Sequence, residues 1–241
     1  MLEIKNLSAE VDGKEVLKDI NLKLEKGKFY ALMGRNGSGK TSLANVLMGN
    51  PKYKITSGEI FLDNENITDI PVNERAKKGI FLSYQNPVEF SGITVSNFLR
   101  TAFNSLSQRK ISLLDFQKLL REKAKELNID ENFLTRYLNE GFSGGEKKKM
   151  EILQMLVLNP NIVVLDETDS GLDIDSLKTI SEGIKKFLNK DKMILIITHY
   201  IKIFDYIKPD KVFIMKDGKI FTEGKMEIIN KLEERGYEGI K

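Results

Sequence analysis

Apolar and polar positions follow two different periods along the chain. Residues 2–7 alternate one by one, as a half-buried strand does. Three apolar runs of strand length (residues 29–33, 162–165 and 193–197) are typical of strands buried on both faces. Helical spacing recurs over residues 43–48, 94–106, 113–127, 146–158, 177–188, 200–207 and 226–232. Strands that alternate with helices predict an α/β fold with a mostly parallel core sheet.

The pattern also predicts how this fold is divided. Asp12-Gly13 is a hairpin-turn signal, which places antiparallel β-strands near the N-terminus. From about Pro87 onwards the spacing is helical, and no strand pattern interrupts it before the next buried strand. We expect one domain, 1–241, with a catalytic α/β core in residues 1–86 and 159–241 and an inserted all-helical subdomain in residues 87–158.

Composition narrows the class of protein. The 241 residues carry 38 basic and 35 acidic side chains, and the formal net charge of +3 gives no argument for a nucleic-acid partner. The chain has no cysteine, so it fits a reducing compartment and cannot supply thiolates to a metal or cluster. The apolar runs are far shorter than the roughly 20 residues of a membrane span. We expect a cytoplasmic protein with no direct membrane insertion.

Gly34 to Thr41 fits the phosphate-binding loop G-x-x-x-x-G-K-[ST], between a predicted strand and a predicted helix. In this context a loop that only caps a helix is the weaker interpretation. The glycines let backbone N–H groups surround a polyphosphate at the helix N-terminus. Lys40 would reach the β- and γ-phosphates, and the Thr41 hydroxyl would bind Mg²⁺. The expected nucleotide-binding residues are Gly34, Arg35, Asn36, Gly37, Ser38, Gly39, Lys40, Thr41 and Ser42.

Polar side chains follow three other predicted strands. Asp166 ends a buried strand, where it can bind Mg²⁺ opposite Thr41, and Glu167 comes next, where a base could act on an attacking water. A solvated acidic turn is the alternative. His199 is the single histidine; such a residue is more often a packed polar group, yet its strand should lie beside that of Asp166. Gln85 could contact Mg²⁺ or the water.

Ser143-Gly144-Gly145-Glu146 precedes a predicted helix. Ser143 and Glu146 form a capping box, and a helix start needs nothing more. Two adjacent glycines also expose N–H groups to an anion, so both interpretations can hold at once.

The chain resembles an ATP-binding-cassette (ABC) ATPase over nearly its whole length, because its motifs stand in the order of that family: the phosphate loop, Gln85, Ser143 to Gly145, Asp166-Glu167, Ser170 to Asp173 and His199. The resemblance implies a P-loop NTPase core, hydrolysis of ATP with Mg²⁺, and a transient homodimer that holds two ATP molecules head to tail. It assigns catalysis to Lys40, Gln85, Glu167 and His199, and Mg²⁺ to Thr41, Gln85 and Asp166. Ser143, Gly144, Gly145, Glu146 and Asp173 would contact the partner's nucleotide, so isolated copies should hydrolyse slowly.

Finer features resemble the SufC family, the soluble ATPases of the Suf iron–sulfur cluster machinery. They are Phe142 and Glu146 in the Ser143 motif, Asp169 after Glu167, residues 87–92 after Gln85, and Tyr200 after His199. This implies a SufB/SufD-type scaffold partner that docks around residues 87–98 and is strained when two cassettes close. The alternatives are the ATP-binding subunit of a membrane ABC transporter and a nucleotide sensor without useful turnover.

Two local expectations remain. Cassettes usually stack adenine on an aromatic residue near position 11, where this chain has Val11, so base selectivity should be modest; Tyr30 should belong to the core. Residues 147–149 are three lysines, which favours a solvated helix face. A sharper hypothesis is that one of them pairs with Glu167 in the isolated subunit and holds it away from ATP.

Overall fold

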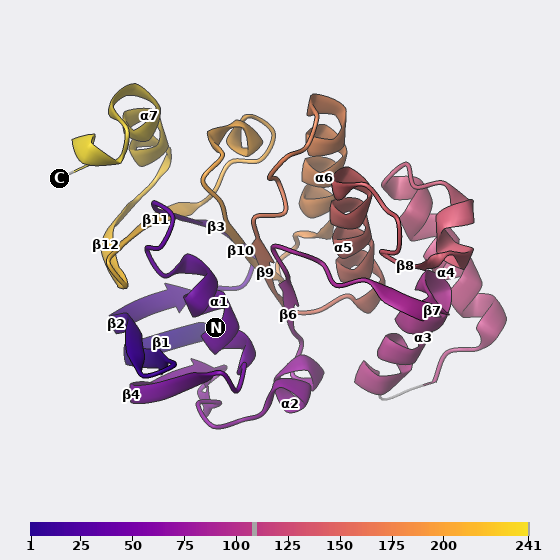
Figure 1. The fold of residues 1–241 in the computed structure, drawn as a ribbon, viewed down its shortest axis with the longest axis horizontal. Helices are drawn as coiled ribbons and strands as arrows, with labels where there is room; N and C mark the ends of the chain where they lie inside the picture. Colours follow the sequence, from indigo (N-terminus) through magenta and orange to yellow (C-terminus); the bar gives the residue numbers. More distant parts are fainter. Residues whose placement is uncertain (108–109, 241) are drawn as a thin grey trace.

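A computed structural model describes residues 1–107 and 110–240, and its centre is a six-stranded sheet (Figure 1). The strand order is β12-β11-β3-β10-β9-β6, and all strands but the edge strand β12 run parallel. The bounds are β3 Lys28–Met33, β6 Ile80–Ser83, β9 Ile162–Asp166, β10 Met193–Ile197, β11 Lys211–Lys216 and β12 Lys219–Gly224. The predicted mostly parallel core sheet is confirmed.

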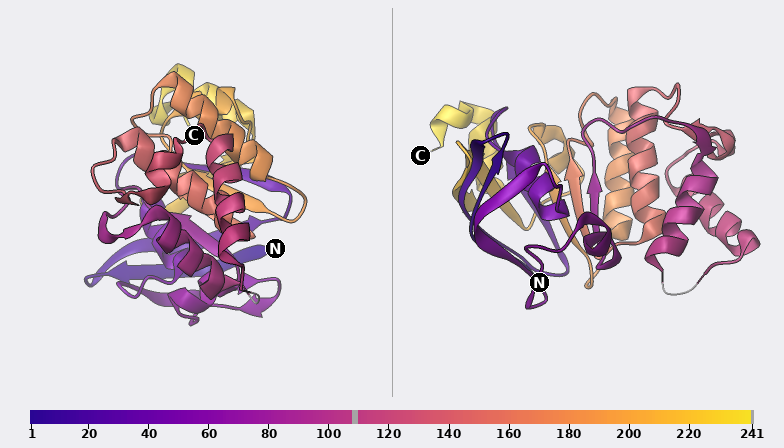
Figure 2. Two further views of the ribbon diagram at one scale, coloured as in Figure 1. Left: turned by 90° about the vertical axis from the view of Figure 1, so that its right-hand side faces the viewer. Right: turned by 60° about the horizontal axis from the view of Figure 1, so that its bottom comes forward.

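A second, antiparallel sheet comes from the N-terminal part of the chain, as the hairpin signal predicts. Its order is β2-β1-β4-β5, with β1 Leu2–Val11, β2 Lys14–Leu24, β4 Tyr53–Leu62 and β5 Glu65–Asn66. Figure 2 shows it at the end of the molecule opposite the helical segment. Helix α1 (Lys40–Met48) lies between the two sheets, and apolar residues of all three form one buried cluster.

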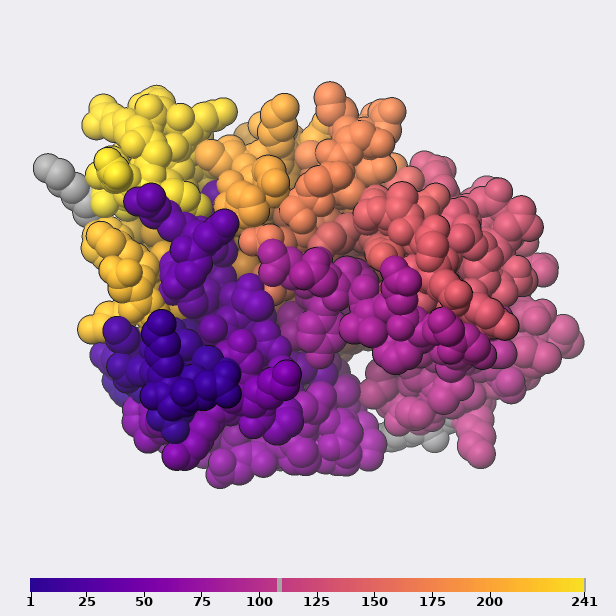
Figure 3. Space-filling model, viewed as in Figure 1, coloured from indigo at the N-terminus to yellow at the C-terminus, as the bar shows by residue number. Residues whose placement is uncertain are grey.

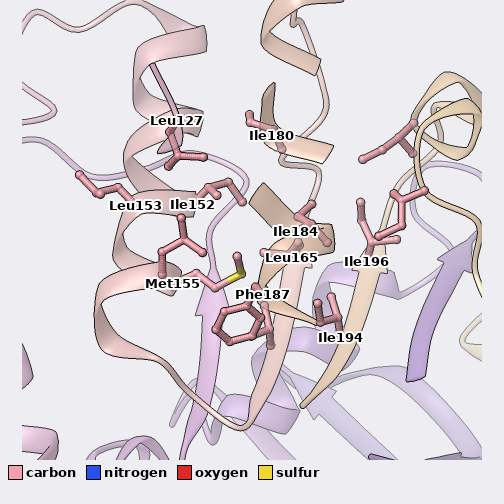
Figure 4. Close-up of a cluster of buried hydrophobic side chains, with 14 of the residues drawn as sticks. Leu127, Ile152, Leu153, Met155, Leu165, Ile180, Ile184, Phe187, Ile194 and Ile196 are labelled. Atoms are coloured by element: carbon pink, nitrogen blue, oxygen red, sulfur yellow. The ribbon is translucent and has the colours of Figure 1, made fainter. Parts of the chain in front are cut away.

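The fully apolar strands are buried on both faces, and successive side chains enter different clusters. In β9, Val163 and Leu165 belong to a buried apolar cluster shared with the helices on one face of the sheet, here called the helical cluster. Ile162 and Val164 belong to the cluster formed with α1 and the antiparallel sheet on the other face. The helical cluster includes α5 (Gly144–Leu158) and α6 (Ile174–Phe187), which pack side by side over β9 and β10 (Figure 4). Tyr30 is buried and stacks on Phe213, as expected for a core residue.

The segment predicted to be all-helical contains α3 (Val95–Leu106), α4 (Leu113–Glu126), the 3-10 turn η1 (Glu131–Thr135) and α5. It is not all-helical, because β7 (Phe90–Thr94) pairs with β8 (Tyr137–Leu138). Two- and five-residue strands that lie 43 positions apart leave no alternating pattern to detect. The predicted limits of this subdomain, 87–158, stay a prediction, because its last helix α5 packs on α3 and α4 inside the limits and also on α6 outside them. Residues 108–109 lie outside the described part of the chain.

The remaining elements differ from the expected pattern in small ways. The helix expected over 200–207 is a 3-10 turn, η2 (Ile201–Asp205). The helix expected over 226–232 is α7 (Met226–Arg235), which is longer by three residues and is followed by η3 (Tyr237–Gly239). Helix α2 (Val72–Lys77) is not predicted, because a six-residue helix has too few turns to show a period. Within residues 1–107 and 110–240, no helix has the length and apolar character needed to cross a membrane.

Candidate functional site

The carboxyl ends of β3, β9 and β10 bring the predicted chemistry together. Strand β10 lies between the other two, and Ile197 pairs with Leu32 on one side and with Asp166 on the other. The loop from Gly34 therefore starts at the same edge of the sheet as Asp166 and Glu167, and His199 follows two residues after the end of β10. The prediction that the histidine strand lies beside the Asp166 strand is confirmed.

The loop Gly34–Gly39 folds around the ammonium of Lys40. Lys40 Nζ donates hydrogen bonds to the carbonyl oxygens of Gly34 (2.8 Å) and Arg35 (3.1 Å). Burial lowers the pKa of Lys40, and the charges of Glu167 and Asp166 oppose that shift. Gly39 has a φ of 105°, a left-handed conformation that favours glycine, directly before the first turn of α1. The loop presents the N-terminus of α1 to the space in front of it.

That space is a cavity of about 530 Å³. Eight of the predicted site residues line it: Asn36, Gly37, Gly39, Lys40, Thr41, Ser42, Gln85 and Glu167. Its other walls are residues that the sequence reasoning missed, from the β1–β2 hairpin and the β11–β12 turn: Lys14, Glu15, Val16, Lys18, Asp217 and Gly218. The turn signals mark these positions as hairpins, but nothing in the sequence places them opposite the loop.

Asp166 and Thr41 meet at one end of this region. Thr41 Oγ1 donates to Asp166 Oδ1 at 3.4 Å, and Asp166 is almost fully buried. Burial, with the neighbouring charge of Glu167, raises the pKa of Asp166 to about 6. A hydroxyl beside a desolvated carboxylate is a donor set that suits Mg²⁺, whose charge would compensate for the burial.

Glu167 is held in an unusual conformation. Its φ is 51°, in the left-handed region that is strained for a residue with a side chain, and its N–H donates to the Ile197 carbonyl at 2.9 Å. One carboxylate oxygen accepts from Gln85 Nε2 at 2.7 Å, and the other lies 3.3 Å from His199 Nδ1. The structure thus joins three predicted catalytic residues in one cluster at the cavity.

The lysine hypothesis needs a correction. Lys148 is the buried member of the three lysines, and its Nζ donates to the backbone carbonyls of Glu167 (2.9 Å) and Gln85 (2.8 Å). Lys147 pairs with Glu89 at 2.6 Å. Among the described residues, no lysine forms an ion pair with the Glu167 carboxylate. The ammonium therefore fixes the main chain at Gln85 and Glu167, while the side chains of Gln85 and His199 contact the Glu167 carboxylate. A fully solvated lysine face is also wrong, since Lys148 is buried.

The Ser143 motif lies elsewhere. The capping box is confirmed: Glu146 N–H donates to Ser143 Oγ, and Ser143 N–H donates to the Glu146 carboxylate. Asp173 caps the neighbouring helix α6 through Ser176, and Gly145 lies beside Leu172 and Ser176. In the part of the chain that the structure describes, neither this motif nor Asp173 lines the cavity. Of the two interpretations of this motif, helix capping is the one whose contacts are found within the subunit.

Gly34, Arg35 and Ser38 of the phosphate loop do not line the cavity, and neither do Asp166 and His199. Gly34 N–H donates to the hydroxyl of Tyr237 at 3.1 Å, so the C-terminal segment contacts the phosphate loop. Arg35 and Ser38 line a second hollow of about 450 Å³ behind the loop. Val11 does not line the 530 Å³ cavity; Val16 does, and no aromatic side chain is among the described residues of its wall.

Comparison with known sequences gives the family. A family model described as ABC transporter matches residues 17–170, more than half of the chain. The probable ABC transporter ATP-binding protein SpyM3_0208 of Streptococcus pyogenes is 49% identical over 100% of this chain and 94% of its own. The probable ATP-dependent transporters slr0075 of Synechocystis (47% identical, 99% of this chain, 94% of its own) and ycf16 of Cyanophora paradoxa (45%, 99% and 93%) are similar over the same length.

Comparison with solved structures agrees with the fold. The ATP-binding cassette MJ1267 superposes with a TM-score of 0.80 at 26% identity, covering 100% of this chain and 98% of that one. The dimeric structure of the cassette MJ0796 bound to ADP and Pi gives a TM-score of 0.82 at 24% identity, with 94% and 99% covered. The cassette fold expected from the motif order is thus confirmed, and the chain belongs to the ABC transporter family as an ATP-binding subunit and ATPase.

Proposed function

We propose that this ATPase is a SufC-like subunit that closes around ATP with a second copy of itself and thereby moves a SufB/SufD-type scaffold during iron–sulfur cluster assembly. The observation that carries the assignment is the set of residues around the site that departs from the common transporter pattern. Asp169 is one of them: it accepts a 2.6 Å hydrogen bond from Thr198 Oγ1, and burial raises its pKa to about 6. This hydrogen bond connects the loop after Glu167 to Thr198, the residue before His199.

The chemistry starts from the cavity lined by Lys40 and the N-terminus of α1, which would hold the β- and γ-phosphates. Thr41, Asp166 and Gln85 would hold Mg²⁺, which would neutralise charge on the phosphate oxygens. The Glu167 carboxylate would orient the attacking water and accept its proton, and His199 would steady the carboxylate and the γ-phosphate. The roles of Gln85, Glu167 and His199 are consistent with the contacts that join these three side chains.

The position of the Ser143 motif supports a dimer. Ser143-Gly144-Gly145 and Asp173 lie at the N-termini of α5 and α6, and they do not line the cavity beside the phosphate loop of the same chain. A Cβ built on Gly144 would meet no atom within 4 Å, so there is open space beside this residue. N–H groups at a helix N-terminus suit the γ-phosphate of an ATP bound to a second copy. One chain then supplies only half of each site, and turnover depends on dimerisation.

Exposed apolar side chains around the loop after β6 would form the docking patch: Tyr84 (47% exposed), Val88 (58%), Phe90 (46%) and Tyr137 (47%). Phe90 stacks on Phe98, so the patch continues onto α3. The magenta segment that carries this loop crosses the face of the molecule between the α/β part and the helices (Figure 3). A partner that binds here would contact the loop of Gln85 directly, and ATP-dependent changes at Glu167 would reach it.

The second candidate is the ATP-binding subunit of a membrane transporter, because the similar sequences are named as transporter proteins. Both candidates use the same patch and the same ATP chemistry, so the partner distinguishes them. The zero cysteines of this chain agree with cluster ligands that lie on a separate scaffold.

Co-purification of the tagged protein without detergent tests the proposal. We expect a cysteine-bearing scaffold in near-equal amount, lost in Phe90→Asp but retained in the control Leu114→Asp, which changes a 79% exposed leucine of α4. A polytopic membrane protein that appears only with detergent would replace the proposal with the transporter function.

A further inference from the structure

Helix α5 carries a buried carboxylate that has no place in the ATP chemistry described above. Glu151 is 5% exposed and lies one turn after Lys148. Its Oε2 accepts from the backbone N–H of Tyr84 at 3.2 Å, and its Oε1 accepts from Gln154 Nε2 at 3.2 Å. Tyr84 follows the end of β6 and directly precedes Gln85.

These contacts connect the Ser143 helix to the catalytic carboxylate. Glu151 holds the residue before Gln85, Lys148 holds the Gln85 carbonyl, and the Gln85 side chain holds Glu167. The same helix begins with Gly144 and Gly145, next to the capping Ser143. A displacement of α5 would therefore move the main chain of Gln85 with it.

We propose that Glu151 is a positioning residue for Gln85, which couples the place of helix α5 to the place of the Gln85 amide against Glu167. The inference rests on the proposed roles of Gln85 and Glu167 in hydrolysis. Glu151 contacts no reacting atom in this scheme. It acts through the Tyr84 N–H, which sets where the Gln85 loop leaves the sheet.

Burial of the Glu151 carboxylate costs folding free energy, which argues against a purely structural role. Its pKa is raised to about 7 by desolvation, with only Lys148 as a charged neighbour among the groups that shift it. A buried carboxylate opposes folding unless it is fully compensated, and an apolar residue of similar size would pack without that cost. An apolar residue would leave the Tyr84 N–H without an acceptor, and that N–H controls the Gln85 loop.

Three variants test the inference in the whole protein. Glu151→Gln keeps an acceptor for Tyr84 N–H, Glu151→Leu removes it, and Glu122→Leu makes the same change at an exposed glutamate of α4. Turnover and KM for ATP are measured together with melting temperature, and amide hydrogen exchange of the peptide containing Tyr84 and Gln85 reports the loop directly. Glu167→Gln is assayed in parallel.

We expect Glu151→Leu to lower kcat at least five-fold with KM within two-fold of the wild type, and to speed exchange in the Gln85 loop. Glu151→Gln and Glu122→Leu should keep at least half of kcat. Wild-type kcat in Glu151→Leu, equal loss in Glu151→Gln, or a loss that only follows the melting temperature without faster loop exchange would overturn the inference. If Glu167→Gln itself keeps turnover, the proposed roles fail, and that result is separate from any effect at Glu151.

Discussion

Gln85 and Glu167, 82 positions apart in the sequence, are joined by a 2.7 Å hydrogen bond from Gln85 Nε2 to Glu167 Oε2. The bond links the loop that would bind a partner to the carboxylate that would act on water. His199 contacts the other oxygen of the same carboxylate. Any movement that the partner or ATP imposes on Gln85 therefore changes the position of Glu167.

Substitutions at two glycines distinguish an effect on the folding of one subunit from an effect on the assembly of two. A Cβ on Gly34 would collide with the Met215 carbonyl oxygen and with Ser38 Oγ, whereas a Cβ on Gly144 would meet nothing within 4 Å. Gly34→Ala should cost about 2 kcal/mol or more of stability through overpacking. Gly144→Ala should leave the free energy of unfolding within about 0.5 kcal/mol of the wild type and still lower turnover at least ten-fold.

Denaturant unfolding and ATP turnover of both variants check this prediction. If Gly144→Ala retains full turnover, the surface around Ser143 does not contact a nucleotide on a second copy.

Base selectivity should be modest. The cavity wall near the β1–β2 hairpin offers Val16 between charged residues, and no aromatic platform is among its described residues. Stacking of a base on an aromatic side chain is worth about 1–3 kcal/mol, and that contribution is missing here. We expect kcat/KM for ATP and GTP to differ by less than about ten-fold, and Val16→Tyr to improve KM for both. A hundred-fold preference for ATP would point to a base contact from elsewhere.

The sequence predicts the parallel core well, because buried strands and ordered motifs are local signals. It also predicts which loops would meet, since β3, β9 and β10 end at one edge of the sheet. It does not predict the β7–β8 pair, whose few residues come from distant parts of the chain. Such pairing depends on tertiary packing and leaves no periodic pattern.

The sequence also does not predict which groups the side chains contact. The sequence shows three lysines beside a motif, but only the packing of α5 decides that Lys148 is the buried one and that it binds carbonyl oxygens. Tyr237 is likewise 203 positions from its partner Gly34. Contacts of this range depend on how helices and loops pack, which composition and spacing do not encode.

Arg75 should be essential for stability. It is 1% exposed, and its guanidinium donates to the carbonyls of Val46 and Leu47 at the end of α1 and to those of Thr68 and Ile70. Arg75→Met removes the donor of these four hydrogen bonds and should lower the free energy of unfolding by about 3 kcal/mol or more. Arg75→Lys should restore little, because one ammonium cannot reproduce the planar fork.

The measurement is urea unfolding, with Arg121→Met as the control at an exposed arginine of α4. Equal stability of Arg75→Met and Arg121→Met would contradict the structural role.

Glu151 should make stability fall as pH rises. The pKa of Glu151 is about 7 in the folded protein against an ordinary value of 4.5. As pH rises between these values, the unfolded chain releases this proton before the folded protein does, so the free energy of unfolding falls. Glu151→Gln removes the cost and should be more stable than the wild type by about 1–3 kcal/mol at pH 8, with little difference at pH 4.5. Asp166 and Asp169, with pKa values raised to about 6, leave a slope of the same sign in both proteins.

Unfolding free energies at the two pH values check this, with Glu122→Gln as the exposed control. Parallel pH curves for the wild type and Glu151→Gln would mean that Glu151 is not desolvated in solution.

The most direct test of the account is Glu167→Gln, with ATP turnover and mass in solution measured with and without ATP and Mg²⁺. The substitution keeps the shape of the side chain and removes the proton acceptor. The account predicts that turnover falls at least 100-fold and that ATP converts the 27.5 kDa chain into a stable dimer. Turnover close to that of the wild type, or a variant that stays monomeric at saturating ATP, would contradict it.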